Sequence, residues 1–157
     1  MFGKTALVFT TVLCFVAFGE STDVIECKNG RNLDNIKSIT ITNCEEPPCE
    51  LKRGTRVELV QKFVPNEDVD RLTTSVSATI LGVRLPFIGV DGSDACQNVY
   101  DADGKVGCPL KAGTEYYYKN GFPVLEIYPK VKLVVSWALL GSSNPITCFE
   151  IPSKITS

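Results

Sequence analysis

Apolar side chains recur at every second position of one segment near the C-terminal end of the chain, namely Val131, Leu133, Val135, Trp137 and Leu139. Successive side chains of a β-strand point to opposite faces, so this period of two places all five on one face of a strand. Shorter alternating runs begin near residues 39, 57, 76 and 116, and a last one covers 146–151. Turn-forming clusters of Gly, Pro, Asn and Asp separate these runs. About seven short strands with turns between them predict an all-β sandwich or barrel.

The first 19 residues have the features of a secretory signal peptide. Lys4 supplies a positive charge, residues 6–18 are apolar, and Ala17-Phe18-Gly19 forms a cleavage site of the small-x-small type. No later stretch is long and apolar enough to span a bilayer. We therefore expect residues 1–19 to be removed and residues 20–157 to form one exported domain, whose length suffices to bury roughly 70% of the surface of the unfolded chain.

Cysteine spacing gives a second constraint. Of the seven cysteines, one lies in the expected signal peptide, and the remaining even number in an exported chain indicates three disulfides. Spacing alone permits fifteen connectivities. One pair can clip a turn that contains two prolines, a second can close the turn-rich segment DADGKVG, and the last two cysteines can join the ends of the domain. The expected pairs are Cys44–Cys49, Cys96–Cys108 and Cys27–Cys148.

Several function classes are disfavoured by the composition. The chain has no histidine, which removes Ser-His-Asp and Cys-His catalysis and, with no CxxC pair, argues against a zinc site. Oxidised cysteines would not supply a thiolate nucleophile. The neighbouring pairs of acidic residues lie in predicted turns, where such residues are usually solvated. A hydrolase built on two carboxylates remains an alternative that nothing favours. No basic cluster is longer than Lys52-Arg53, so nucleic acid is not an expected partner. We expect no enzyme activity, no metal and no cofactor.

A series of motifs in a fixed order extends over residues 27–152. It consists of Cys44-x4-Cys49, LGVRLPF (81–87), CPL (108–110), tyrosines near 116–118, and FPVLEIYPKVKLVVSW (122–137) followed by CFEIP (148–152). Taken together, these motifs resemble the Niemann-Pick C type 2 family of the ML (lipid-recognition) superfamily, which also includes the group 2 mite allergens. The order is more specific than any one motif. The cysteine pairing expected from spacing is also the pairing that this family uses.

The resemblance implies an immunoglobulin-like β-sandwich with a hydrophobic tunnel between its sheets. It implies that Phe87, Val124 and Tyr128 lie at the mouth of the tunnel, and that Val135 and Trp137 form part of its wall. Periodicity alone would instead make these side chains ordinary core. Two prolines, at 123 and 129, fix φ and lack an amide donor, which suits the rim of a pocket better than a central strand.

Two further positions of the expected wall depart from the family pattern. Phe149 stands where vertebrate members often have tryptophan, and Val57 stands where some members have tyrosine. Each difference changes the shape of the expected cavity and therefore the ligand that fits it.

The function implied by the resemblance is a secreted, monomeric carrier. It would bind sterol or another hydrophobic lipid, leave it chemically unchanged, and transfer it to a membrane or a transporter partner. Carriage of semiochemicals or fatty acids, and innate-immune recognition of microbial lipids, are alternatives within this class. A solid sandwich that acts as an interaction module is the alternative from another class. No Asn-x-Ser/Thr sequon occurs, which favours an extracellular fluid over the lysosome as the location.

Overall fold

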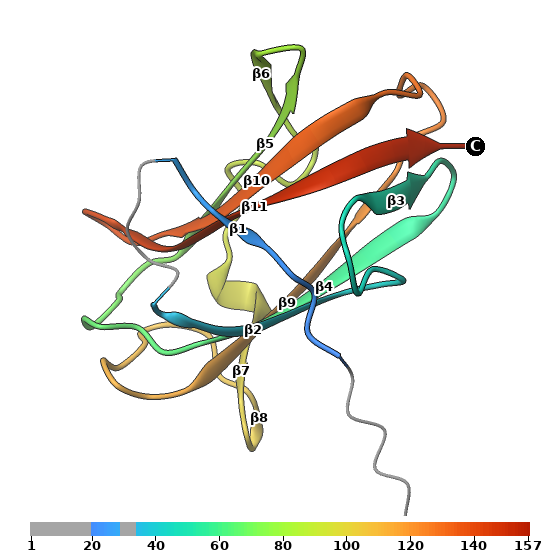
Figure 1. The fold of residues 1–157 in the computed structure, drawn as a ribbon. Helices are drawn as coiled ribbons and strands as arrows, with labels where there is room; N and C mark the ends of the chain where they lie inside the picture. The colour runs from blue at the N-terminus through green and yellow to red at the C-terminus, as the bar shows by residue number, and fades with distance from the viewer. Residues whose placement is uncertain (1–19, 29–33) are drawn as a thin grey trace, which may run out of the picture.

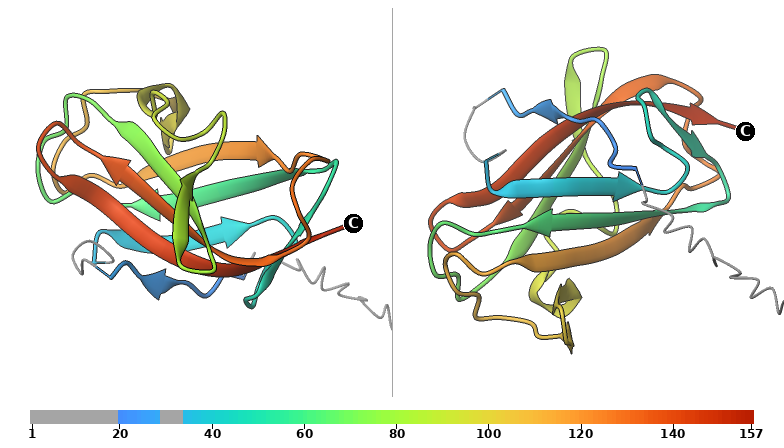
Figure 2. Two further views of the ribbon diagram at one scale, coloured as in Figure 1. Left: turned by 90° about the horizontal axis from the view of Figure 1, so that it is seen from above. Right: turned by 60° about the horizontal axis from the view of Figure 1, so that its bottom comes forward.

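Each alternating run of the sequence forms a strand in the computed structural model, which describes residues 20–28 and 34–157. The strands make two sheets that pack face to face (Figure 1). In the right-hand view of Figure 2, β2, β4 and β9 of one sheet lie in front of β5, β10 and β11 of the other. The all-β sandwich expected from the sequence is thus confirmed. The expected signal peptide, residues 1–19, lies outside the described residues.

The larger sheet, sheet I, includes both the stripe at 131–139 and the C-terminal strand. Its members, in spatial order, are β1 (Ile25–Glu26), β11 (Pro145–Thr156), β10 (Lys132–Leu140), β5 (Thr73–Ile80) and β6 (Val83–Pro86), with β3 (Cys49–Lys52) also paired to β11. The β3–β11 pair is parallel, and the other pairs of this sheet are antiparallel.

Sheet II is antiparallel throughout. Its members, in spatial order, are β2 (Ile36–Ile41), β4 (Arg56–Phe63), β9 (Tyr116–Pro123), β7 (Val99–Asp101) and β8 (Gly104–Lys105). A 3-10 turn, η1 (Cys96–Asn98), precedes β7. The described residues contain eleven strands, more than the expected seven or so. The difference comes from short edge strands such as β1 and β8, whose two residues cannot show an alternating pattern.

The core lies between the sheets and is built from alternate residues of the long strands. On β10, Leu133, Val135, Trp137 and Leu139 are all 5% exposed or less. Antiparallel register sets Trp137 beside Phe149 of β11 and Val76 of β5. The stripe that the sequence shows is therefore the inner face of sheet I.

Three disulfides reinforce the sandwich, and all three have the expected partners. Cys27–Cys148, Cys44–Cys49 and Cys96–Cys108 have Cα–Cα distances of 5.8, 5.3 and 5.2 Å, respectively. The second of these joins the turn after β2 of sheet II to β3 of sheet I, so it links the two sheets covalently.

Candidate functional site

A small apolar cavity lies between the two sheets. Side chains of β2, β4 and β9 form one wall, side chains of β3, β10 and β11 form the other, and Ser153 supplies the one polar side chain. The volume of the cavity is about 20 Å³, which is room for about one water molecule. Sites for small organic ligands usually have about 300–1,000 Å³. In this structure the two apolar walls therefore lie almost in contact.

The four wall residues expected from the sequence meet at this cavity. Val135 and Trp137 approach from β10, Phe149 from β11 and Val57 from β4. Each is 5% exposed or less. Val57 is paired with Phe122 of β9 in the register of sheet II, so the departure from tyrosine at this position leaves the wall lined by valine and phenylalanine.

Two of the three expected mouth residues form an aromatic cluster. The rings of Phe87 and Tyr128 meet edge to face, and Phe87 also contacts Phe122, with centroids 4.8 Å apart. The ring of Phe122 in turn lies next to the ring of Trp137, with centroids 6.0 Å apart. Tyr128 is only partly buried, and this burial raises the pKa of its hydroxyl. A connected row of aromatic rings thus leads from a partly exposed tyrosine to the wall of the cavity.

Val124, the third expected mouth residue, is 1% exposed and does not line the cavity. Its amide donates to the carbonyl of Thr55 at 2.8 Å, and its carbonyl accepts from the amide of Gly54 at 2.7 Å. These hydrogen bonds tie the end of β9 to the turn before β4. Val124 is therefore part of the same buried core as the wall residues, but it does not line the cavity.

Sequence reasoning missed other residues of the cavity. Leu59 and Ile151 line it and lie two positions from Val57 and Phe149, so the alternation itself could have found them. Phe122 could not be found in this way, because its place depends on the register between β4 and β9.

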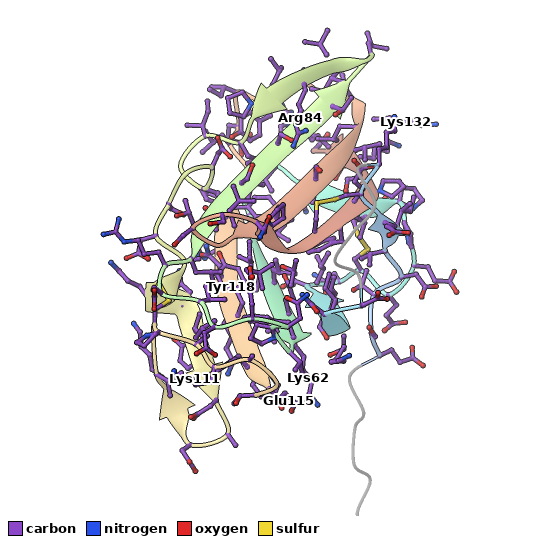
Figure 3. All side chains as sticks on the ribbon, turned by 90° about the vertical axis from the view of Figure 1, so that its left-hand side faces the viewer. Lys62, Arg84, Lys111, Glu115, Tyr118 and Lys132 are labelled. Carbon is purple, nitrogen blue, oxygen red and sulfur yellow. A yellow bond between two sulfur atoms is a disulfide. The ribbon has the colours of Figure 1, made fainter. Side chains whose placement is uncertain are left out.

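Tyr118 lies deeper between the sheets (Figure 3) and is fully buried. Its ring is 6.3 Å from that of Trp137, and its hydroxyl accepts a hydrogen bond from Asn120 Nδ2 at 2.8 Å. Burial raises the pKa of the Tyr118 hydroxyl to about 12, because the phenolate would be poorly solvated there, and the hydrogen bond from Asn120 opposes part of that rise.

Large apolar side chains are exposed next to the aromatic cluster. Ile88 follows Phe87 and Ile127 precedes Tyr128, and these two are 67% and 81% exposed. Leu81, in the β5–β6 turn at the top of Figure 1, is 99% exposed. Large exposed apolar side chains, where they form a contiguous patch, are typical of surfaces that contact a membrane or a partner.

A larger groove, of about 850 Å³, lies on the outer face of sheet I. Its lining includes the charged residues Lys28, Glu67, Arg84 and Glu150. Such walls do not suit a hydrocarbon ligand, since apolar pockets carry few polar groups. The small cavity between the sheets is therefore the better candidate site, although it is the smaller of the two.

Metal binding and membrane spanning are two further functions that depend on groups of residues visible in the fold. Within residues 20–28 and 34–157, no three His, Cys, Asp or Glu side chains are grouped in a way that could hold a metal ion. None of the helices in the same residues has the length and hydropathy that crossing a membrane requires.

The fold and this cavity define a two-sheet sandwich with an apolar interior, and comparison with known proteins gives the same class. A family model described as "ML domain" matches residues 21–155. The chain is 32% identical to the ecdysteroid-regulated 16 kDa protein of Manduca sexta, over 95% of this chain and 99% of that protein. It is 33% identical to NPC intracellular cholesterol transporter 2 of Canis lupus familiaris, over 76% of each chain.

A solved structure supports the same family. A crystal structure of a Niemann-Pick type C2 protein from the Japanese carpenter ant superposes with a TM-score of 0.67 and 30% identity, covering 77% of this chain and 91% of that one. The chain belongs to the ML-domain family, and its resemblance to the Niemann-Pick C type 2 proteins is confirmed.

Proposed function

We propose that this chain is a carrier that holds a sterol or another hydrophobic small molecule between its two sheets and releases it unchanged. The observation that carries the proposal is the apolar cavity, to which both sheets contribute side chains and which an aromatic row connects to a partly exposed tyrosine. The relatives support it, since one is named a cholesterol transporter.

The carrier must open to bind. A cavity of about 20 Å³ has to expand by more than tenfold to reach the size of usual ligand sites. The disulfide Cys44–Cys49 joins the sheets covalently beside the cavity, whereas Phe87 meets Phe122 and Tyr128 through ring contacts alone. We infer that entry separates these rings. Burial of hydrocarbon, at roughly 2.5 kcal/mol for each 100 Å² removed from water, offsets the packing that is lost.

The location and the partner follow from features outside the cavity. The predicted signal peptide and the three disulfides support secretion into an extracellular fluid. The exposed side chains of Leu81, Ile88 and Ile127 support delivery by contact with a membrane or a transporter. In this proposal the carrier is a monomer, and it acts without catalysis because neither transfer nor binding requires a reacting group.

The single tryptophan of the chain provides a direct test, because Trp137 lines the cavity. Purified mature protein would be titrated with dehydroergosterol and, separately, with cis-parinaric acid, while energy transfer from Trp137 is recorded. We expect saturable binding at one molecule per chain for at least one probe. In Trp137→Phe the energy transfer should vanish while the fluorescence enhancement of the probe remains. If neither probe saturates with the wild-type protein, the carrier proposal fails.

A further inference from the structure

Two of the strands that line the apolar cavity continue into buried polar side chains. On β4, Val57 and Leu59 line the cavity, and Gln61 is the next residue on the same face. On β11, Ile151 and Phe149 line the cavity, and Thr147 is the next residue along the strand on the same face. Two residues along a strand span roughly 7 Å. One strand of each sheet, β4 and β11, therefore changes from apolar to polar one step beyond the same end of the cavity, whereas β10 continues with the apolar Leu139 beside Thr147.

These polar groups have no partner among the described residues. Gln61 and Thr147 are both 0% exposed. Neither the oxygen nor the nitrogen of the Gln61 amide is hydrogen-bonded in the described structure, nor is the Thr147 hydroxyl or the Nε1 of Trp137. A buried polar group without a hydrogen bond destabilises the folded state by about 1–3 kcal/mol. Such groups are rare and call for an explanation in each case.

Neighbouring side chains connect Gln61 to the cavity. Tyr118 is its partner across the β4–β9 register, and the Tyr118 ring lies 6.3 Å from the Trp137 ring, which itself lines the cavity. The Tyr118 hydroxyl already accepts from Asn120. The Gln61 amide and the Thr147 hydroxyl thus each offer a donor and an acceptor at this end, and the described residues use none of them. The amide is the larger group and reaches further from its strand.

The chemistry of this end excludes charged ligand groups. None of the buried side chains in the described part of the chain carries a charge, so a carboxylate or an ammonium placed there would be uncompensated and costly. A hydroxyl suits the site best, because it can donate to Gln61 Oε1 and accept from Gln61 Nε2 or Trp137 Nε1.

We propose that the inner end of the cavity recognises a neutral hydroxyl group. This hydroxyl lies at the end of the ligand that enters first and is buried most deeply, and the Gln61 amide forms hydrogen bonds with it. This inference rests on the proposed carrier function and names its ligand class, an amphiphile that is hydroxylated at the end of its hydrocarbon part. When the side chain of a sterol enters first, a sterol with a hydroxyl at the tip of that chain belongs to this class, whereas cholesterol, whose side chain is a plain hydrocarbon, brings no polar group to Gln61.

The test compares cholesterol with 25-hydroxycholesterol, two sterols that differ only by a hydroxyl at the end of the side chain. Competition against bound dehydroergosterol would give both affinities for the wild-type protein and for Gln61→Leu. The matched control is Gln97→Leu, because Gln97 is exposed on η1 and is not among the residues that line the cavity. Thr147→Val provides a second variant that removes a hydroxyl with little change of shape.

We expect the wild type and Gln97→Leu to bind 25-hydroxycholesterol at least tenfold more tightly than cholesterol. In Gln61→Leu this preference should fall to threefold or less, while the melting temperature of the ligand-free protein holds or rises. Thr147→Val should reduce the preference in the same direction. Equal affinity of the wild type for the two sterols would overturn the inference. An unchanged preference in Gln61→Leu would also overturn it. Neither result would contradict the carrier function. Absence of binding to both sterols and to cis-parinaric acid would instead contradict the carrier function itself.

Discussion

The ring of Phe87 meets the ring of Tyr128 edge to face, with centroids 5.8 Å apart and planes inclined by 80°. Phe87 directly follows β6 of sheet I, whereas Tyr128 lies in the connection from β9 of sheet II to β10. The contact therefore joins segments that leave different sheets. Because it is noncovalent, its strength should set how readily the interior opens.

Removal of the tyrosine ring tests this role. In Tyr128→Ala the loss of an aromatic pair should lower the free energy of unfolding by about 1 kcal/mol, and the release rate of a bound fluorescent sterol should rise severalfold. Stopped-flow displacement would measure the rate. Tyr117→Ala is the matched control, since Tyr117 is partly buried on β9 at a position that alternates with the inward tyrosines. Equal release rates in both variants would argue against a gate at Tyr128.

Val124 allows a second test, in which the sequence and the structure suggest different results. A valine that faces a tunnel should accept a larger ring, so the resemblance predicts that Val124→Phe blocks ligand binding with no loss of stability. The structure has this side chain 1% exposed and away from the cavity lining. We therefore expect overpacking that costs about 1–3 kcal/mol, measurable by urea unfolding of the ligand-free protein. An unchanged or raised stability would reveal space in front of Val124 after all.

The disulfides should differ in their contributions to stability. Cys27–Cys148 closes a loop with a sequence separation of 121, and Cys44–Cys49 closes one of 5. Loop-entropy arguments give the long loop about 5 kcal/mol and the short loop about 2 kcal/mol. Replacing both cysteines of a pair by alanine and measuring unfolding in urea would compare them. A larger loss for the 44–49 pair would mean that its link between the sheets matters more than chain entropy.

Much of the fold could be predicted from the sequence because the strands are amphipathic. A period of two identified the inner face of β10 directly, and turn residues marked the ends of the strands. Gln61 shows where this reasoning stops. The period of two places Gln61 on the same face as Val57, Leu59 and Phe63, and the structure has it buried there. Alternation gives its face, but it does not show that the amide of this polar residue lacks a hydrogen-bond partner between the sheets.

The candidate site was predictable in part, for a similar reason. The wall residues Val135, Trp137, Phe149 and Val57 all reach the cavity. The degree of closure between the sheets was not predictable, because it depends on how side chains from six strands pack against one another, and a sequence pattern gives a face but no distance.

Tyr118 leads to the last prediction, which concerns alkaline pH. Its pKa is raised to about 12 in the folded protein from an ordinary value of 10.0. The unfolded chain therefore loses this proton first, so the stability due to the neutral, buried phenol is fully present below pH 10 and is lost as the pH rises through 12. The free energy of unfolding should fall by up to about 1.4 kcal/mol for each pH unit in that window.

Urea unfolding at several pH values between 9.5 and 11.5 would measure this loss. Tyr118→Phe is the control, because it keeps the ring and removes the titrating hydroxyl. Lys62 and Lys111 also have raised pKa values, through their contacts with Glu115 and Asp68, and they titrate in both proteins. The wild type should therefore lose stability more steeply than Tyr118→Phe. Parallel slopes for the two proteins would mean that the phenol of Tyr118 ionises in the folded state as easily as in the unfolded chain, and that the interior at this point is open to water.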